Sequence, residues 1–540
     1  MPLVPLRGSI SASGDLSPLS YIGSTIQGKP NTLVMTGEKK KRYVCRADIA
    51  MAEKSIGKIH LGPKEGLAIV NGTAASTSVG ALVMHEAMCQ VTLAQILTAM
   101  SVEALLGTDE SFDPFFSHVR PHPGQKDVAG TVFSLLEHSS LMQRGDGSEK
   151  SSLRQDRYSI RTAPQWIGPI LEDIALAYEQ VATELNSVTD NPLIDITGPQ
   201  NRIIHGGNFQ AKSITSAMDK VRLGTQSIGK MIFAQCTELI NPATNRGLPP
   251  NLVFDEPSES YIWKGTDIMI AALVSELGFL ANPVGTHVQS AEMGNQSLNS
   301  LALISARYTL DAITVLTQLS SAHLVALCQA LDLRAMNNRF LERLEGDLKN
   351  LFLALPPNTL DTSKTPEGFE HYWKKCWAIF TSRCTQLMTS NSADRFATAV
   401  SAMSAYLLPF LNNHNPEAVG SIQVWVVSSS QWAVDAFNAN KDQYFANPDA
   451  TPYLGIAASK MYTFVRKELR IPFIRNDSIS TPKEEKFGSG GGPFERDERR
   501  IGMTMGDVVT KVYQSQRSGV LYEVVVDCLR ATLQDQDTVI

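Results

Sequence analysis

The segment that decides the fold lies at the start of the chain and reads Arg7-Gly8-Ser9-Ile10-Ser11-Ala12-Ser13-Gly14-Asp15-Leu16-Ser17-Pro18-Leu19-Ser20-Tyr21. The Ser17-Pro18 pair predicts a helix start, with Ser17 as N-cap and Pro18 as the first helical residue, because proline lacks only an N–H that would be unpaired there. The small residues 12–14 are therefore expected just before a helix N-terminus. Such an end has free N–H groups and a partial positive charge, so it stabilises negative charge that develops beside it.

Three small residues before a helix are, by themselves, most often only a loop. The longer string, from Leu6 through Asp15 to Tyr21, closely resembles the signature of the aromatic amino acid ammonia-lyases. In that family the glycine nitrogen attacks the alanine carbonyl, and loss of two waters leaves a methylidene-imidazolone (MIO) ring. The resemblance implies that this cofactor forms from Ala12, Ser13 and Gly14, with Ser13 Cβ as its exposed carbon.

A second motif is the segment Gln155-Asp156-Arg157-Tyr158-Ser159-Ile160-Arg161-Thr162-Ala163-Pro164-Gln165-Trp166. If it is helical, spacings of three place Gln155, Tyr158 and Arg161 on one broad face. An amide, a phenol and a guanidinium suit a small zwitterion, since arginine grips a carboxylate with two parallel hydrogen bonds. Alone, such a face is more often a solvated helix surface. The segment also resembles a lyase motif, which implies that Gln155 and Arg161 bind substrate and that Tyr158 belongs with the catalytic residues.

Three further positions take their roles from the resemblance. Asn71 could simply start a helix, and Asn71-Gly72-Thr73 is formally a glycosylation sequon, but the position matches the lyase asparagine that contacts the MIO ring. Asn191 lies in a turn cluster after a helix expected over 168–185, and matches another active-site asparagine. Phe209 follows two glycines that predict a tight turn before the next helix; it could be a packing residue, but it matches the ring beside MIO and substrate.

A long helix is expected from His287 to about Asn338, because the helical pattern runs almost without a breaker. Its first turns carry a polar stripe at i, i+3, i+7 and i+10, formed by Gln289, Glu292, Gln296 and Asn299. Such a stripe usually faces water. The resemblance instead implies that Glu292 and Gln296 lie near the substrate amine and pocket.

The expected fold is all-α, a long-helix bundle of the ammonia-lyase type with an inserted helical shielding domain. Residues 1–65 would complete the MIO domain, and 66–339 would form the central helical core, with one helix over about 66–106. The Trp- and Tyr-rich residues 340–470 resemble the shielding domain of plant and fungal phenylalanine lyases. Residues 471–540 would be a glycine-rich linker at 486–493 and a final helix, about 505–533, that returns to the core.

Composition excludes several other classes. A net charge of −6 over 540 residues offers no basic face, so we expect no nucleic-acid partner. Seven scattered cysteines have no CxxC spacing, and His118 and His122 lie among turn residues, so no metal is expected. The N-terminus resembles no secretion signal, and no apolar run looks long enough to span a membrane. We therefore expect a cytoplasmic protein with no membrane partner.

The reaction that the resemblance implies is non-oxidative deamination of L-phenylalanine to trans-cinnamate and ammonia, by a homotetramer. Tyrosine ammonia-lyase and an MIO-dependent aromatic aminomutase share these motifs and remain alternatives, as does an inactive truncated homologue. The family's catalytic tyrosine lies on a loop well upstream of the triplet, and only eleven residues precede Ala12. We therefore expect that tyrosine to match no residue of this sequence, the chain to be N-terminally truncated, and its turnover as written to be doubtful.

Overall fold

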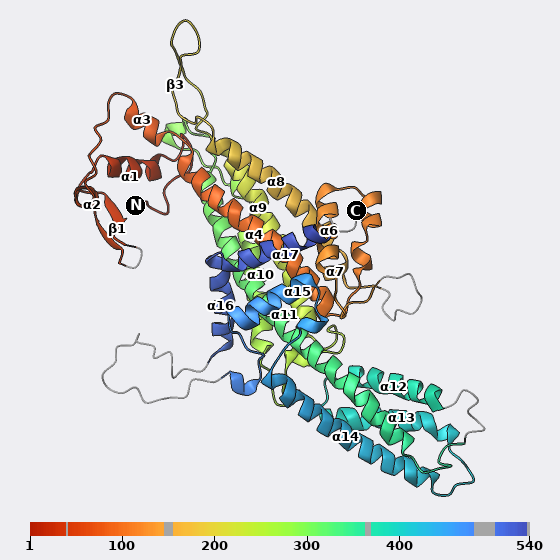
Figure 1. Ribbon diagram of the computed structural model, residues 1–540. Coiled ribbons are helices and arrows are strands. Elements are labelled where there is room, and N and C mark those ends of the chain that lie inside the picture. Colours follow the sequence, from red (N-terminus) through yellow and green to blue (C-terminus); the bar gives the residue numbers. More distant parts are fainter. Residues whose placement is uncertain (39–40, 145–154, 362–368, 480–502, 537–540) are drawn as a thin grey trace, which may run out of the picture.

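A computed structural model describes residues 1–540 except 39–40, 145–154, 362–368, 480–502 and 537–540. The described part is an elongated helical molecule in which long helices form a central bundle, with a small mixed region at one end and a helical extension at the other (Figure 1). Its β-sheets among the described residues are two antiparallel pairs of short strands. The all-α prediction is confirmed.

The central bundle consists of five long helices, which are α4 (Ala74–Ala104), α8 (Ala163–Leu185), α9 (Lys212–Ile240), α10 (Lys264–Leu280) and α11 (Ala302–Leu353). One hydrophobic cluster runs through all five of them. Short helices pack beside α8 and near the end of α4, and these are α5 (Pro114–Val119), α6 (Pro123–Leu135) and α7 (Tyr158–Arg161). The helix expected over 168–185 begins five residues earlier and ends where the sequence predicts, before the turn cluster that precedes Pro192.

The N-terminal region consists of α1 (Leu16–Ile26), strands β1 (Leu33–Thr36) and β2 (Tyr43–Arg46), α2 (Ala47–Glu53) and α3 (Glu65–Val70). Leu33 pairs with Arg46 in the antiparallel β1–β2 hairpin. The single helix expected over 66–106 is two helices, α3 and α4, because residues 71–73 leave the helical conformation and Gly72 has a φ of 155°. A second hairpin, β3 (Leu193–Asp195) with β4 (Arg202–Ile204), projects from the same end of the bundle (Figure 1).

The extension combines the second half of α11 with α12 (Phe369–Gln386), α13 (Ser392–Leu407) and α14 (Ala418–Ala446). It has its own aromatic-rich core between Phe340 and Phe437, separate from the main cluster. Residues 450–474 pack with the main cluster instead. The predicted domain limits stay a prediction, but this packing places the end of the predicted 340–470 segment in the bundle.

The chain returns to the bundle through α15 (Ile456–Thr463), a short π-helix (Phe464–Glu468), α16 (Met505–Arg517) and α17 (Val520–Gln536). The final helix expected over 505–533 is thus divided, at Gly519 with a φ of 88°. The predicted linker at 486–493 lies outside the described residues. Asp332 of α11 is fully buried and accepts hydrogen bonds from Tyr444, Tyr462 and Arg466, so one carboxylate joins α11, α14 and the returning segment.

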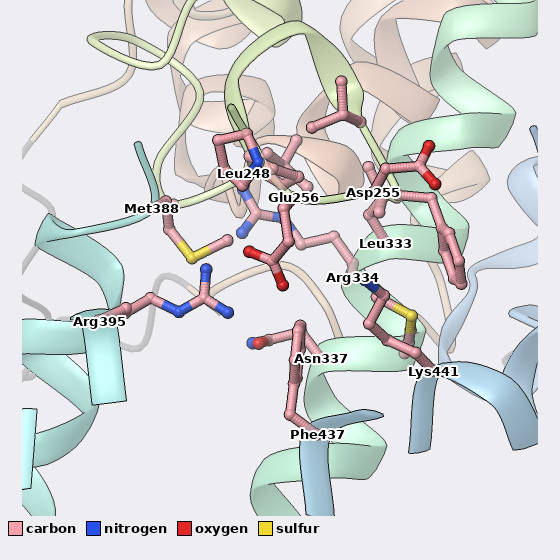
Figure 2. A pocket seen from close by; sticks show the side chains of 16 residues that line it. Leu248, Asp255, Glu256, Leu333, Arg334, Asn337, Met388, Arg395, Phe437 and Lys441 are labelled. Atoms are coloured by element: carbon pink, nitrogen blue, oxygen red, sulfur yellow. The ribbon is translucent and has the colours of Figure 1, made fainter. Parts of the chain in front are cut away.

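A cavity of about 30 Å³ lies where the extension meets the bundle (Figure 2). The Glu256 carboxylate lines it and accepts hydrogen bonds from the backbone N–H and the hydroxyl of Ser392, at the start of α13. Arg395 stacks on the Phe437 ring on the same side. These contacts attach the extension to the bundle, and none of the predicted site residues lines this cavity.

Three helical segments are long and apolar enough to span a membrane by length and composition alone: Glu65–Ala104, Lys264–Thr286 and Ala302–Leu353. The expectation that no apolar run reaches that length is therefore wrong. In the last segment, 78% of the apolar window is buried within the protein, so packing in the bundle accounts for its hydropathy. The corresponding shares are 39% and 28% in the other two segments. The predicted location and the absence of a membrane partner stay predictions.

Candidate active site

Ser13 lies on a tightly held loop at the N-terminal end of α4. Its Oγ accepts a hydrogen bond of 3.0 Å from Gln296 Nε2. The neighbouring Gly14 has a φ of 78°, and a Cβ there would lie 2.1 Å from the backbone nitrogen of Gly72. Only glycine fits at that position, because any side chain would meet backbone. The loop therefore approaches residues 71–73 as closely as two backbones can.

Asp15 fixes this loop from inside. It is fully buried, and its Oδ1 accepts hydrogen bonds from the hydroxyls of Ser9 (3.1 Å) and Ser11 (2.7 Å). Its Oδ2 accepts a hydrogen bond of 2.6 Å from the backbone N–H of Ser76, in the first turn of α4. A carboxylate is stabilised there by the free N–H groups and dipole of α4. The predicted start of α1 is corrected: the helix begins at Leu16, with Asp15 as the flanking residue, rather than at Pro18.

The expected helix from His287 is wrong over its first fifteen residues. Residues 287–301 form loops and a 3-10 turn (Glu292–Gly294), and α11 begins only at Ala302. Glu292, Met293 and Leu301 have φ values near 50°, which a right-handed helix cannot contain. This loop instead holds the Ser13 segment, since the backbone N–H groups of Ser300 and Leu301 donate to the carbonyls of residues 11 and 10.

Of the two predicted residues on this loop, Gln296 reaches Ser13 and Glu292 does not. The Glu292 carboxylate is exposed and accepts a hydrogen bond of 2.9 Å from Asn295 Nδ2. The predicted polar stripe therefore does not exist as a helix face. Its members lie on a loop, and only Gln296 makes a side-chain contact with the triplet.

Asn71 and Asn191 lie together on the same side of the molecule as Ser13. Asn71 Nδ2 donates to the backbone carbonyl of Asn191 at 3.3 Å, and Asn191 Oδ1 accepts from the N–H of Gly206 at 2.9 Å. The predicted tight turn before α9 is present, and it presents Phe209 half-buried just before that helix. Gln210 Nε2 donates to the carbonyl of Leu298, which links this turn to the loop before α11.

Gln155, Tyr158 and Arg161 form a second cluster. The helix there is only four residues long and begins at Tyr158, so Gln155 precedes it. Gln155 and Arg161 line an open cleft of about 360 Å³. The guanidinium of Arg161 lies 4.7 Å above the Tyr158 ring, and 70% of Tyr158 is exposed. Within the described residues, the side chain of Arg161 has no hydrogen bond or ion pair, so its guanidinium N–H groups are available to a ligand.

These two clusters lie at opposite ends of α4 (Figure 1). Asp15 binds the first turn of that helix, whereas Asp156, next to Gln155, binds the N–H of Thr108 beyond its last turn. A helix of 31 residues is about 45 Å long at roughly 1.5 Å per residue. One chain therefore does not bring the predicted site residues together. It carries two half-sites: the Ser13 half-site (Ser13, Asn71, Asn191, Gln296) and the Arg161 half-site (Gln155, Tyr158, Arg161).

Comparison with known proteins gives the family. A model of aromatic amino acid lyases matches residues 1–350. A phenylalanine ammonia-lyase of Aspergillus lentulus is 43% identical over 550 residues, which cover 98% of this chain and 72% of that protein. The crystal structure of phenylalanine ammonia-lyase from Rhodosporidium toruloides is 37% identical, with a TM-score of 0.87 over 98% of this chain and 78% of that one. The chain belongs to the aromatic amino acid lyase family.

Other members of the family act on other substrates or form other products, as their names say. Histidine ammonia-lyase from Trypanosoma cruzi is 25% identical, with a TM-score of 0.55, and covers 79% of this chain and 73% of its own. A phenylalanine aminomutase of Talaromyces islandicus is 39% identical over 524 residues, which cover 96% of this chain and 71% of that protein. The lyase is thus a carbon–nitrogen lyase with the expected helical fold, and membership of the family implies an MIO cofactor.

Residues that support the half-sites of this lyase were missed in the sequence. Asp15 lies within the signature, and a carboxylate close to Ser9 and Ser11 in sequence is the signal that could have predicted its role as a hydrogen-bond acceptor. The pairing of Asp156 with Arg246 joins residues ninety positions apart in sequence. No local sequence pattern predicts a contact between residues so far apart, so the pair is recognised only in the three-dimensional structure.

Proposed function

We propose that the protein releases ammonia from L-phenylalanine to give trans-cinnamate, with an MIO group formed from Ala12, Ser13 and Gly14. The observation that carries the proposal is the Ser13 half-site, where a glycine that tolerates no side chain and a serine held by Gln296 lie against the start of α4. The names of the similar phenylalanine ammonia-lyases support the choice of substrate.

The residues of the triplet fit the MIO group. Ala12 and Gly14 are buried, so their peptide groups are held away from water, while Ser13 is half-buried and its hydroxyl faces Gln296. Buried Asp15 keeps the loop in one conformation through Ser9 and Ser11. When formed, the group supplies an electrophilic carbon that converts the substrate's amino group into a better leaving group.

The other residues bind and orient the substrate. Arg161 would bind the carboxylate through its unpaired N–H groups, with Gln155 beside it in the cleft. Gln296 holds Ser13, and Asn71 and Asn191 brace the loop beside it. Removal of the weakly acidic β-proton needs a positioned base, a contribution of roughly 10²- to 10⁴-fold. Tyr158 is the only phenol of the Arg161 half-site.

We further propose that the protein acts as a homotetramer in which each site combines half-sites from different copies. Separation of the two half-sites along α4 supports this, because one substrate cannot reach both in one chain. Large apolar side chains near them also face solvent, including Leu82 (70% exposed), Phe279 (75%) and Leu298 (78%). A partner copy would bury these surfaces.

A second candidate function is isomerisation of phenylalanine to β-phenylalanine. The similarity to the Talaromyces islandicus aminomutase favours it, since 96% of this chain aligns with that enzyme. An aminomutase re-adds the amine to the same intermediate, so the half-sites do not separate the two reactions. Tyrosine ammonia-lyase activity is a third candidate, because the tyrosine and phenylalanine lyases share the motifs described above.

The test is a product analysis of the purified protein incubated with phenylalanine and, separately, with tyrosine. The proposal predicts equal amounts of cinnamate and ammonia from phenylalanine. Accumulation of β-phenylalanine would make the protein an aminomutase, and faster release of coumarate from tyrosine would change the substrate. A peptide containing Ser13 should also be lighter than its sequence by two water molecules, and an unmodified peptide mass would contradict the cofactor.

A further inference from the structure

The Arg161 half-site is held by a chain of hydrogen bonds that starts on α11 and ends in an ion pair. Arg334 of α11 is buried and donates to three carbonyls: that of Ala104, at the end of α4, and those of Asn245 and Arg246. Arg246 in turn donates to the carbonyls of Leu105 and Leu106, at 3.1 and 2.8 Å. Two guanidinium groups thus bind the negative, C-terminal end of α4.

Arg246 connects this helix end to the motif segment. Its Nη2 donates to Asp156 Oδ1 at 2.6 Å, and the side chain of Asp156 is completely buried. The other oxygen of Asp156 accepts 2.9 Å from the N–H of Thr108, whose side chain lines the Arg161 cleft. Both carboxylate oxygens of Asp156 therefore have partners that are fixed by α4 and α11.

The ion pair between Asp156 and Arg246 matters because Asp156 lies within the motif that forms the Arg161 half-site. It stands next to Gln155 in sequence and two residues before Tyr158, the first residue of α7. Other contacts also hold this segment: the Ser159 hydroxyl donates to Glu238 and its carbonyl accepts from Gln235, both of α9, and Ile160 is buried in the main hydrophobic cluster. Arg246 also has a left-handed φ of 54°, a conformation uncommon for arginine that indicates a constrained site.

We propose that Asp156 and Arg246 are positioning residues for the carboxylate-binding cleft: their ion pair fixes Gln155, Tyr158 and Arg161 against the end of α4 so that the Arg161 guanidinium points into the cleft. This proposal rests on the proposed function, since it assumes that the cleft takes the carboxylate of the substrate or product. Neither residue need touch the ligand.

The test variant is Asp156→Asn, which keeps the side-chain size. One end of the amide would now present an N–H group to Arg246 or Thr108, both of which are donors, so the segment has to shift. We measure binding by titration calorimetry with trans-cinnamate and with cinnamamide, which lacks the carboxylate. The Kd for cinnamate should rise about tenfold while that for cinnamamide changes little, because only the placement of Arg161 is lost. With phenylalanine, KM should rise more than kcat falls.

The matched control is Asp332→Asn, which breaks another fully buried aspartate–arginine pair, with Arg466; the side-chain partners of Asp332 are Tyr444, Tyr462 and Arg466, none of which belongs to a half-site. Both variants should lower Tm, but Asp332→Asn should keep the wild-type ratio of the two Kd values. If Asp156→Asn does not fold, Arg246→Lys retains the charge and loses the planar fork, and it should reduce the preference for cinnamate several-fold.

The outcomes separate this proposal from the proposed function. If the wild-type protein binds cinnamate no better than cinnamamide, the carboxylate site itself is wrong and both proposals fall. If the wild type prefers cinnamate and the folded Asp156 and Arg246 variants keep that preference unchanged, the positioning role alone is overturned. Equal weakening of both ligands would also overturn it, because it would indicate a general loss of structure.

Discussion

The two ends of α4 differ in how complete they are. At the N-terminal end, the loop that carries Ser13 is enclosed by protein: Ser9, Ser11, Ala12 and Asp15 are buried, and both oxygens of Asp15 have partners. At the C-terminal end, the supporting Asp156 is buried, but the residues expected to bind the ligand are open to solvent, since Gln155 and Tyr158 are exposed.

The difference matches the chemistry of each half-site. A cofactor made from the chain itself needs one fixed backbone conformation before any substrate arrives, so its loop has to be held by protein alone. A carboxylate-binding arginine has to remain unpaired until the ligand comes, because an internal partner would compete with it. Helix α4 supplies hydrogen-bond partners at both ends. An N–H group of its first turn donates to Asp15, and carbonyls at its C-terminal end accept from Arg246 and Arg334.

The largest effect is expected for Ser13→Ala. Alanine has no β-hydroxyl to eliminate, so the MIO ring cannot form and ammonia release should fall to the assay background. The fold should survive, because Ser13 is half-buried and its side chain makes only the Gln296 hydrogen bond. Parallel measurement of activity, Tm and peptide mass checks this. Full activity in a folded Ser13→Ala protein would remove Ser13 from the mechanism.

A stability prediction tests how tightly the loop that carries Ser13 is packed against residues 71–73. Gly14→Ala would place a Cβ against the backbone of Gly72 at a φ of 78°, and should cost about 3 kcal/mol or more. The control is Gly130→Ala, at an exposed position of α6 with open space around it, which should stabilise by about 0.5–1 kcal/mol. Urea unfolding measures both changes. Similar midpoints for the two variants would show that the loop adapts freely.

The open half-site is tested by Arg161→Lys. Lysine keeps the charge but cannot form two parallel hydrogen bonds to a carboxylate. The loss should be about 2–3 kcal/mol, or roughly 30- to 150-fold in kcat/KM for phenylalanine. Because Arg161 has no partner in the described structure other than the Tyr158 ring, Tm should change little. A kcat/KM equal to that of the wild type would rule out Arg161 as the carboxylate anchor.

The last prediction concerns the pH dependence of stability and Glu103, near the C-terminal end of α4. Burial raises the pKa of this carboxyl group to about 8, so the folded protein holds a proton that the unfolded chain releases near pH 4.5. Stability should therefore fall as pH rises from about 4.5 to about 8, by at most roughly 1.4 kcal/mol per pH unit. Glu103→Gln should flatten this slope. The free energy of unfolding, measured at pH 5 and pH 8 for the wild type and for Glu103→Gln, gives the two slopes. Equal slopes in both proteins would contradict the raised pKa.

Some of the fold could be predicted from sequence because the signals are local. The end of α8 follows from the turn cluster before Pro192, and the break before α9 from two adjacent glycines. The polar run at 287–301 has helical spacing by chance, and what decides its structure is distant: its backbone binds residues 10 and 11. A single sequence does not contain that pairing.

The candidate site also has features that the sequence predicts and features that it does not. Ser13, Gln296 and Arg161 are predicted from the resemblance to the family, and for Arg161 also from its residue type, because a planar guanidinium suits a carboxylate. Their distribution over two ends of one helix is not predictable from the sequence, since it depends on how distant segments pack against α4. Glu292 was predicted near the substrate amine from its match to the family, but in a single chain it points into solvent.

The most direct measurement is complementation between two inactive variants, Ser13→Ala and Arg161→Ala, produced separately and together in one cell with different affinity tags. Each variant alone should release almost no ammonia, because each lacks one half-site. If sites combine half-sites from different copies, the doubly tagged mixed oligomer should regain a substantial fraction of wild-type activity, since some of its sites pair an intact Ser13 with an intact Arg161. A purified mixed oligomer as inactive as either parent, while wild-type protein is active, would contradict the shared site.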